Sequence, residues 1–451
     1  MKHRALLVVA GLIGAVTLVA TISVAAAGTS SPKRHAAPAR TAAIAPPKVP
    51  NAAAIRAKYK GQSIQFVGDA AVGNSHKRDL KLVARFTKDT GIKVNLVPHP
   101  SASDASYSQL ARAFGSKSSK PDVMMLDVVW PGAFAPYLVN LKPALGKFSK
   151  QFVKASIQNN TIGGKLVAMP WFGDFGILYY RTDLLKKYGY KSPPTTWNQL
   201  FSMAKKVQDG EQKSNKNFYG FVFQGNSYEG LTCDALEWVA SAGGGSFIDN
   251  GKVTIDNARA RTILDAMRAQ VGRITPRGVT SYDEEGARNV FAAGDAMFMR
   301  NWPYAYAANQ TTPVKGKFAV TVLPHGAAGH SVGTVGGWQL GVSKFSKHKA
   351  AAIAFVRYMT SAPVQKFDAI FNTNVPTIPA VARIKAVVKT NPYLTPKIAN
   401  VARAFRPGKF LKTHYNEGSK AIYQGVSQIL NGTPARSVLP SIASKLKSLT
   451  K

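Results

Sequence analysis

The chain has 451 residues, of which 45% are hydrophobic and 18% charged, a composition that excludes an intrinsically disordered protein and leaves room for two or three domains. Its 59 lysine and arginine residues exceed its 22 acidic residues, for a formal net charge of +37. The basic residues are scattered, without an RNP-like aromatic motif or a C2H2 spacing, so we expect no nucleic-acid partner. Attraction to an anionic cell envelope and adaptation to acid both stay open as explanations of the charge.

The N-terminus has the features of an export signal. Met1–Arg4 is basic, and the apolar run that follows ends in small residues at Ala27. We expect residues 1–27 to be a cleaved signal peptide or, because the run is long enough to span a bilayer, a retained signal anchor. Residues 28–60, rich in proline, alanine and lysine, are expected to form a tether. In either case the rest of the chain would be extracytoplasmic, secreted or tethered to the outer face of the cytoplasmic membrane.

Strand and helix patterns alternate after the tether. The apolar spacing predicts, in order, a strand, a helix, a strand, a helix and a continuous apolar strand at residues 64–66, 80–86, 92–96, 110–114 and 123–126. A fully apolar strand within such alternation is typical of a parallel sheet that helices cover on both faces.

The alternation continues to the C-terminus. Helices are predicted over residues 184–188, 197–207, 259–271, 284–293, 349–359 and 441–449, and strands over 218–223, 318–323 and 339–342. Thr196 precedes the second of these helices as a plausible N-cap. We expect an α/β protein with two lobes, in which the chain changes lobe near residues 166, 306 and 360. The first lobe would then comprise residues 61–165 and 306–360, and the second lobe 166–305 and 361–451.

Carboxylates and aromatic side chains gather in four turn-like segments. Asp127 follows the apolar strand directly, at the end of the strand where open parallel sheets bind ligands, although it could also cap the next helix. The other segments contain Phe172 with Asp174, Trp302 with Tyr304, and Gly337 with Trp338. Each aromatic alone is more commonly a core residue. Together they suit a sugar, whose C–H faces bury against rings and whose hydroxyls donate to carboxylates.

Two enzymatic interpretations are alternatives to a binding protein. Gly329–Gly333 matches the G-x-S-x-G elbow of serine hydrolases, and Asp368 and His414 follow in triad order. A glycine-rich loop precedes this motif and a strand follows it, whereas the elbow must lie between a strand and a helix. Asp127 and Asp174 could also form the carboxylate pair of a glycosidase.

Motifs for cofactors and metals are absent from the sequence. It contains no P-loop, no H-E-x-x-H and no dinucleotide-binding fingerprint. Its single cysteine, Cys233, allows neither an intramolecular disulfide nor a cysteine-rich metal site. We therefore expect no cofactor and no metal.

A series of short motifs extends over residues 61–445. It comprises Pro121–Val123, Leu126–Trp130, Gly164–Leu166, Leu178–Leu185, Lys187–Gly189, Pro194–Trp197, Tyr219–Gly225, Tyr228–Leu231, Arg300–Ala305 and Gly336–Trp338. In this order the motifs resemble the extracellular sugar-binding proteins of ABC importers, in particular the trehalose/maltose-binding branch. The resemblance implies a periplasmic-binding-protein-like (type II) fold, with two lobes, three hinge crossovers and a cleft between the lobes. It also implies a protein without catalytic activity that passes trehalose, maltose or a related sugar to ABC-transporter permease subunits. We expect this protein to be a monomer.

The resemblance assigns roles to single residues. Asp127 would accept hydrogen bonds from the sugar in the first lobe, and Asp174 would do so in the second. The residues expected to enclose the sugar or to offer it backbone are Trp302, Tyr304, Gly337 and Trp338. Arg406 would correspond to a ligand-facing arginine, and Phe172 stands where a tyrosine is common.

Two first-lobe contacts of the branch are missing from the sequence. Ser75 stands where a glutamate is frequent, and an arginine expected near Ser106 is absent. The resemblance therefore specifies the class of ligand more closely than the individual sugar.

Overall fold

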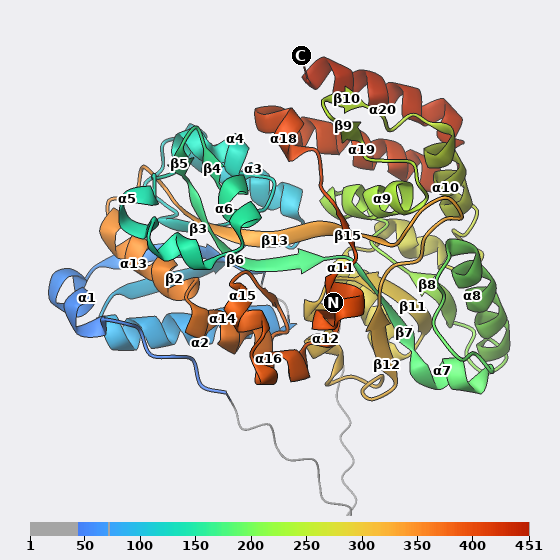
Figure 1. The fold of residues 1–451 in the computed structure, drawn as a ribbon, viewed down its shortest axis with the longest axis horizontal. Coiled ribbons are helices and arrows are strands. Elements are labelled where there is room, and N and C mark those ends of the chain that lie inside the picture. The colour runs from blue at the N-terminus through green and yellow to red at the C-terminus, as the bar shows by residue number, and fades with distance from the viewer. Residues whose placement is uncertain (1–43, 71–72, 451) are drawn as a thin grey trace, which may run out of the picture. The chain divides into compact units, whose positions relative to one another are not determined.

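The computed structural model describes residues 44–70 and 73–450 (Figure 1). The predicted export signal and the first part of the predicted tether lie outside these residues. Within the described ranges, no helix combines the length and the apolarity needed to cross a bilayer.

The predicted tether ends earlier than we expected. Residues 52–59 form helix α1 (Ala52–Tyr59), and the buried Val49 donates its backbone N–H to Asp89 Oδ2 at 2.9 Å. The guanidinium of Arg56 likewise donates to the backbone carbonyl oxygens of Lys88 and Asp89. Because backbone and side-chain groups on both sides of residue 50 are hydrogen-bonded to the end of helix α2 (Gly73–Thr90), this part of the chain packs on the first lobe. The sequence predicts a tether here because residues 52–59 are rich in alanine and lysine. The helix is also too short to show an apolar periodicity.

The first lobe is built on a seven-stranded sheet. Its order is β14-β6-β13-β3-β1-β2, with β15 paired to β13. The strands are β1 (Ser63–Gly68), β2 (Lys93–Pro98), β3 (Val123–Asp127), β6 (Ala168–Phe175), β13 (Val332–Val342), β14 (Val375–Pro376) and β15 (Ala402–Ala404). A short hairpin of β4 (Thr161–Ile162) and β5 (Lys165–Leu166) precedes β6. The helices of this part of the chain are α2 (Gly73–Thr90), α3 (Ser103–Gly115), α4 (Pro131–Phe134), α5 (Lys142–Leu145), α6 (Lys154–Asn159), α13 (Lys349–Met359), α14 (Ala362–Phe371), α15 (Pro379–Ala382) and α16 (Lys385–Thr390).

This sheet is mixed, whereas the sequence pattern predicted a parallel sheet. Strand β1 pairs in parallel with β2 and β3, but β13 runs antiparallel to both β3 and β6. The apolar run at β3 reports correctly that both faces of the strand are buried. It carries no information on the direction of a partner such as β13, which comes from a distant part of the chain.

The second lobe is built on a four-stranded sheet of order β12-β7-β11-β8. Its strands are β7 (Ile177–Arg181), β8 (Tyr219–Val222), β11 (Ala296–Asn301) and β12 (Phe318–Thr321), and a small hairpin joins β9 (Ile248–Asp249) to β10 (Lys252–Val253). The helices are α7 (Thr182–Lys187), α8 (Trp197–Glu211), α9 (Glu229–Ser241), α10 (Ala258–Arg268), α11 (Glu284–Ala293) and α12 (Tyr304–Asn309). Thr196 is the N-cap of helix α8, as the sequence predicted, and its side chain accepts from the backbone N–H of Gln199 in a capping box.

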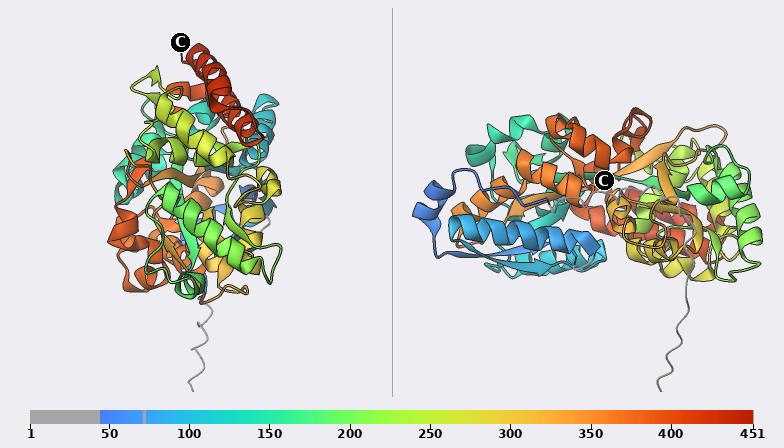
Figure 2. Two further views of the ribbon diagram at one scale, coloured as in Figure 1. Left: turned by 90° about the vertical axis from the view of Figure 1, so that its right-hand side faces the viewer. Right: turned by 90° about the horizontal axis from the view of Figure 1, so that it is seen from below.

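The C-terminal segment returns to the second lobe. After α17 (Pro396–Ala399) and β15, the chain forms α18 (Gly408–Leu411), α19 (Tyr415–Leu430) and α20 (Ala435–Leu449). Helices α19 and α20 pack on each other and on α9 and α10, as the red and green helices of Figure 1 and the left view of Figure 2 show. Leu430, Leu439 and Leu446 are buried in this helical layer.

The chain changes lobe at positions that differ from those we expected. Strand β6 leads into β7 of the other sheet through Gly176, rather than near residue 166. Strand β12 pairs with β7, so the change expected near 306 occurs later, along β13. Helix α14, just after the change expected near 360, still packs on α2 and α13 of the first lobe. We predicted the changes of lobe from clusters of glycine and proline, but such clusters mark the ends of elements. The chain instead passes between the lobes at Gly176 and along the long strand β13, where no such cluster of turn residues was recognised.

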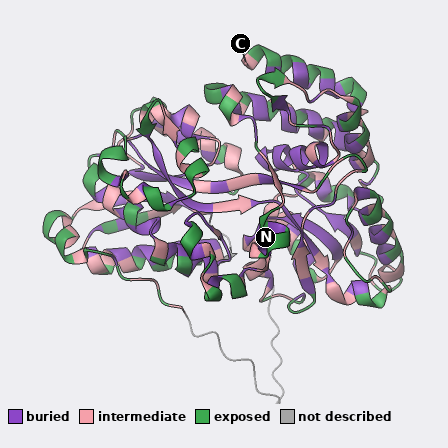
Figure 3. Cartoon of the chain, viewed as in Figure 1, coloured by how far each residue is buried: buried purple, intermediate pink, exposed green. Residues whose placement is uncertain are grey.

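The strands of the two sheets contain the most deeply buried residues. Every residue of β3 and β11 is buried, and exposed residues lie on the outer faces of the surrounding helices (Figure 3). In the first lobe, the ring of Phe355 contacts those of Phe66 and Phe86 edge to face, which packs α13 and α2 against β1. Each buried ring contributes about 1.5–3 kcal/mol of burial free energy.

Candidate ligand-binding site

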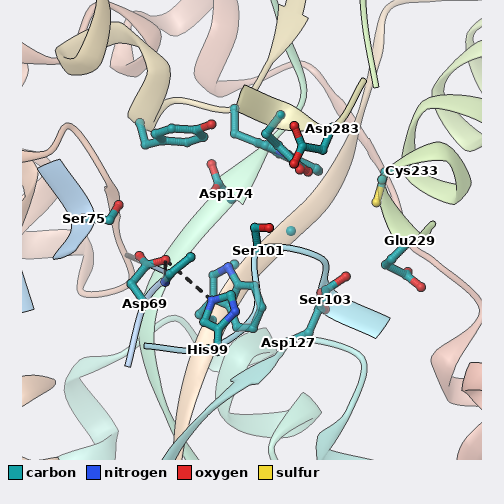
Figure 4. Close-up of a pocket in the computed structure, with 18 of the residues that line it drawn as sticks. Asp69, Ser75, His99, Ser101, Ser103, Asp127, Asp174, Glu229, Cys233 and Asp283 are labelled. Atoms are coloured by element: carbon teal, nitrogen blue, oxygen red, sulfur yellow. Dashed lines mark hydrogen bonds and ion pairs between the residues drawn. The ribbon is translucent and has the colours of Figure 1, made fainter. Parts of the chain in front are cut away.

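A cavity of about 140 Å³ lies where the ends of the first-lobe strands meet the second lobe (Figure 4). Strands β3, β6 and β13 reach it from one side, and the starts of helices α9 and α11 from the other. All eight residues selected from the sequence line this one cavity: Asp127, Phe172, Asp174, Trp302, Tyr304, Gly337, Trp338 and Arg406. Their contacts with a ligand stay predictions.

Trp338 faces the cavity because β13 is irregular at this point. Gly337 has a φ of +110°, and a Cβ placed on it would lie 2.6 Å from the carbonyl oxygen of Phe172, so only glycine fits. The register between β13 and β6 shifts between Trp338 and Gln339. Such a bulge re-aims the neighbouring side chain. The indole of Trp338 stacks on the imidazole of His99, with ring centroids 5.2 Å apart.

Trp302 is held from both sides. The guanidinium of Arg300 lies 3.9 Å from the centre of its ring, and its indole N–H donates to Glu284 Oε1 at 3.1 Å. Arg300 is itself fixed, because it is buried against the carboxylates of Glu237 and Asp234 at 2.6 and 3.0 Å. These contacts hold the ring in one orientation.

Helix α11 orients Tyr304, the second aromatic residue of the segment that contains Trp302. The hydroxyl of Tyr304 donates to Glu285 Oε1 at 2.7 Å, and the hydroxyl of Tyr228 donates to Glu284 Oε2 at 2.6 Å. Burial raises the pKa of Glu284 above its ordinary value, although the hydrogen bonds from Tyr228 and Trp302 oppose the rise. Asp283 caps the helix by accepting from the backbone N–H of Gly286.

Asp174 lies in the cavity wall with an unsatisfied oxygen. It occupies the end of β6, and its Oδ1 has no hydrogen-bond partner among the described residues. Burial raises the pKa of its carboxyl well above the ordinary value, against the opposing charge of Arg300 and the N–H of Phe175. We expected a second-lobe residue here; β6 instead belongs to the first-lobe sheet, because the chain changes lobe only at Gly176.

Arg406 joins residues from the two lobes. Its guanidinium donates to both carboxylate oxygens of Asp127, at 2.6 and 3.1 Å, and to Glu229 Oε1 at 2.7 Å. Asp127 ends β3, and Glu229 begins α9. Glu229 also accepts from the hydroxyls of Tyr415 and Ser419. Burial raises its pKa, and the positive charge of Arg406 opposes that rise.

The sequence left two roles open for Asp127, binding a ligand and capping the next helix, and its hydrogen bonds bear on both. Its Oδ1 accepts from the backbone N–H of Val129 at 3.2 Å, within the turn that follows β3. Helix α4 has Trp130 at its N-cap position and receives no side-chain cap. Asp127 thus stabilises the turn rather than capping the helix, and both of its carboxylate oxygens are bound to Arg406.

Residues 74–366 match the family of bacterial extracellular solute-binding proteins. This chain belongs to that family. A probable ABC transporter-binding protein of Deinococcus radiodurans is 46% identical over 373 residues, which are 82% of this chain and 89% of the relative. The maltose-bound MalE3 protein of T. maritima is 36% identical, with a TM-score of 0.80 over 86% of this chain and all of the other.

A more distant likeness supports the fold alone. The GacH receptor of Streptomyces glaucescens, solved unliganded and with acarbose, is 24% identical, with a TM-score of 0.75 over 86% of this chain and 98% of the receptor. The solute-binding protein therefore has the mixed α/β fold of the periplasmic binding proteins.

Family membership confirms three expectations from the sequence. The solute-binding protein is a component of an ABC transporter, it acts outside the cytoplasm, and it belongs to a family of binding proteins rather than enzymes. The serine-hydrolase interpretation also fails on geometry. Val332 and Gly333 of its motif already belong to β13, Asp368 is ion-paired with the buried Arg78, and His414 is exposed beside Glu417.

Several lining residues of the solute-binding protein were not selected from the sequence. On the second-lobe side these are Glu229, Asp283, Glu284 and Glu285, and on the first-lobe side Asp69 and His99. The run of three acidic residues just before and within a predicted helix was the available signal for Asp283, Glu284 and Glu285. Ser75, the predicted replacement for a glutamate, also lines the cavity, where its hydroxyl accepts from Asn372 Nδ2 at 3.1 Å. Ser106 is buried in α3.

Metal binding has no candidate in the described part of the chain. No group of three or more histidine, cysteine, aspartate or glutamate side chains there is arranged to hold a metal ion. Cys233 is buried at the cavity wall, and burial raises the pKa of its thiol well above the ordinary value.

Proposed function

We propose that this solute-binding protein captures a sugar of the maltose or trehalose type and delivers it to the permease subunits of an ABC transporter. The observation that carries this proposal is the convergence of aromatic rings, Trp302, Tyr304 and Trp338 among them, and several carboxylates on one cavity. The identity of 36% with a maltose-bound protein supports the same class of ligand.

The chemistry of the cavity suits a sugar ring. Trp302, Tyr304 and Trp338 offer apolar faces against which sugar C–H groups can bury. Asp174 brings an oxygen without a protein partner among the described residues, and a sugar hydroxyl placed near it would satisfy that atom. Because Trp302 and Tyr304 are already fixed by hydrogen bonds and a stacked arginine, little side-chain entropy is lost when the sugar binds.

We further propose that three connections act as hinges between the lobes. They are Gly176 between β6 and β7, the start of β13, and the segment that contains β15, which pairs with that start. Motion about a few residues at the ends of strands is a common route to domain closure around a ligand. Arg406, bound at once to Asp127 and Glu229, would then link the two lobes when they are close.

Titration calorimetry of the full chain against a panel of mono- and disaccharides tests the proposal. Maltose or trehalose should bind with one site per chain, change the intrinsic tryptophan fluorescence, and be recovered unaltered. Absence of heat and of a fluorescence change with every saccharide in the panel would overturn the proposal. Recovery of cleaved sugar would contradict a role limited to binding.

A further inference from the structure

Basic side chains cover the outer surface of the first lobe without acidic side chains among them. Residues 128–173 contain five lysines and no acidic residue, and residues 332–394 contain eight lysines and arginines and one acidic residue, Asp368. Asp368 is buried and paired with Arg78, so it does not offset the surface charge. Among the described residues of the first lobe, no aspartate or glutamate is exposed.

The two basic segments meet on one side of the first lobe. The guanidinium of Arg357 in α13 lies over the ring of Phe148, 5.2 Å from its centre. The backbone N–H of Val153 donates to the carbonyl oxygen of Thr377 at 2.9 Å. Helix α14 packs on both α13 and α16. Figure 1 shows these segments as teal-green and orange helices of the first lobe. Their charges therefore belong to one surface.

This surface, the basic face, is defined by six exposed side chains. They are Lys147, Lys150, Lys154, Arg357, Lys366 and Lys385. Charges of one sign that share a surface create a field which attracts polyanions, and at physiological salt this field extends about 8 Å into the solvent.

The second lobe lacks such a one-sided charge. It keeps exposed acidic residues, among them Asp209, Asp249 and Glu417. Adaptation to acid would remove exposed carboxylates from both lobes alike, because the whole surface meets the same solvent. The charge of the first lobe therefore indicates an anionic partner at that lobe.

The chain enters the fold beside the basic face. The hydroxyl of Tyr358, the neighbour of Arg357 in α13, donates to the carbonyl oxygen of Pro47 at 3.0 Å, and α1 packs on α13. The predicted export signal precedes Pro47 in the chain, so an anchored protein would be attached to the membrane through its first lobe. Because the family acts outside the cytoplasm, a lipid surface suits this face better than a nucleic acid.

We propose that the basic face of the first lobe docks on the outer surface of the cytoplasmic membrane by binding anionic lipid headgroups. Each lysine or arginine close to an anionic bilayer strengthens binding about fivefold, and salt screens the attraction. Docking would hold the protein near the membrane in which its transporter lies. This inference does not depend on which sugar the protein binds.

Flotation of the full chain with lipid vesicles tests the proposal. One set of vesicles contains phosphatidylglycerol and phosphatidylcholine in equal amounts, and the other contains phosphatidylcholine alone. The combined variant Lys147→Gln, Lys150→Gln and Lys154→Gln should bind the anionic vesicles roughly 100-fold more weakly than the wild type does. Added salt should weaken binding of the wild type more than that of the variant.

A matched variant removes the same charge from the second lobe. Lys191, Lys213 and Lys216 are exposed there, and their combined replacement by glutamine should leave binding to the anionic vesicles close to that of the wild type. Thermal unfolding of both variants should match that of the wild type, since all six lysines are exposed.

A second measurement locates the contact on the wild-type chain, whatever residues 1–27 contribute to binding. Lysine acetylation followed by mass spectrometry should modify Lys147, Lys150 and Lys154 several-fold more slowly on anionic vesicles than on neutral ones. The three lysines of the second lobe should be modified equally on both.

Three results would overturn the proposal. The first is an equal loss of vesicle binding in the two combined variants. The second is equal acetylation of the basic face on anionic and neutral vesicles. The third is binding of double-stranded DNA through the basic face without any preference for anionic vesicles, which would make the partner a nucleic acid.

Discussion

At the scale of single residues, aromatic rings and carboxylates in the cavity are held in place by neighbouring charged side chains. Arg300 fixes Trp302 from behind, Arg78 fixes Asp69, and Glu285 fixes Tyr304. The rings and Asp127 could be selected from the sequence, but no local pattern shows which charged side chains hold the rings in place. Asp69 and His99 could also have been selected from the sequence, because each follows a predicted strand, as Asp127 does.

Replacement of Trp338 by alanine should weaken sugar binding. The lost stacking face is worth about 1–3 kcal/mol, which calorimetry with maltose or trehalose would measure. Trp338→Phe keeps a smaller ring and should lose less. Equal affinity for all three proteins would show that Trp338 does not contact the sugar.

Asp174 should make stability fall as pH rises. Burial raises its folded pKa above the unfolded value, so between these two values the folded state binds more protons than the unfolded state. The contribution of this group is therefore full below the unfolded pKa and is lost as pH rises through the folded pKa. Compared with Asp174→Asn, the wild type should lose unfolding free energy above pH 4, at no more than about 1.4 kcal/mol per pH unit. Urea unfolding of both proteins at several pH values checks this, and parallel curves would refute it.

At the scale of elements, periodic helices were predicted best. Residues 284–293 and 349–359 form α11 and α13 with the predicted bounds, because each has a clear apolar face and a definite end. Only the last part of β13 was predicted, since its first half contains three glycines and reads as a loop. Those glycines serve the contact with β6 and the turn toward Trp338, which no local pattern reveals.

Gly337→Ala should destabilise the protein through this contact. Gly432 also has a positive φ, of +116°, but nothing lies near its added Cβ, whereas at Gly337 a Cβ would lie 2.6 Å from a backbone oxygen. Gly432→Ala should therefore cost about 1 kcal/mol from strain alone, and Gly337→Ala clearly more. Chemical denaturation of the two variants measures the difference. Equal losses would mean that the backbone of β6 yields to the methyl group.

At the scale of the whole molecule, residues distant in the chain meet at Arg406. It lies 279 residues from Asp127 and 177 from Glu229 in sequence. The resemblance suggested an arginine that faces the ligand, and no sequence pattern indicated that it links the lobes. The two-lobed α/β class was predictable from alternating patterns and ordered motifs. The changes of lobe were not, because strands that continue across the boundary leave no turn signal.

Glu229→Ala should destabilise the protein by about 3–5 kcal/mol, because it leaves the buried Arg406 with one carboxylate instead of two. Glu417→Ala is the matched control, since Glu417 pairs with Lys445 on the surface, where an ion pair is worth no more than about 1 kcal/mol. Denaturant unfolding compares them. A loss for Glu229→Ala as small as that of the control would contradict a linking role for the buried pair.

The central claim is that a sugar occupies the space between Trp302, Trp338 and Asp174, with residues of both lobes around it. A crystal structure of the protein grown with maltose or trehalose tests this most directly. The account predicts a sugar ring against Trp338 or Trp302, with one hydroxyl on Asp174. An empty cavity at a sugar concentration that saturates binding in solution, or sugar bound at another place, would contradict it.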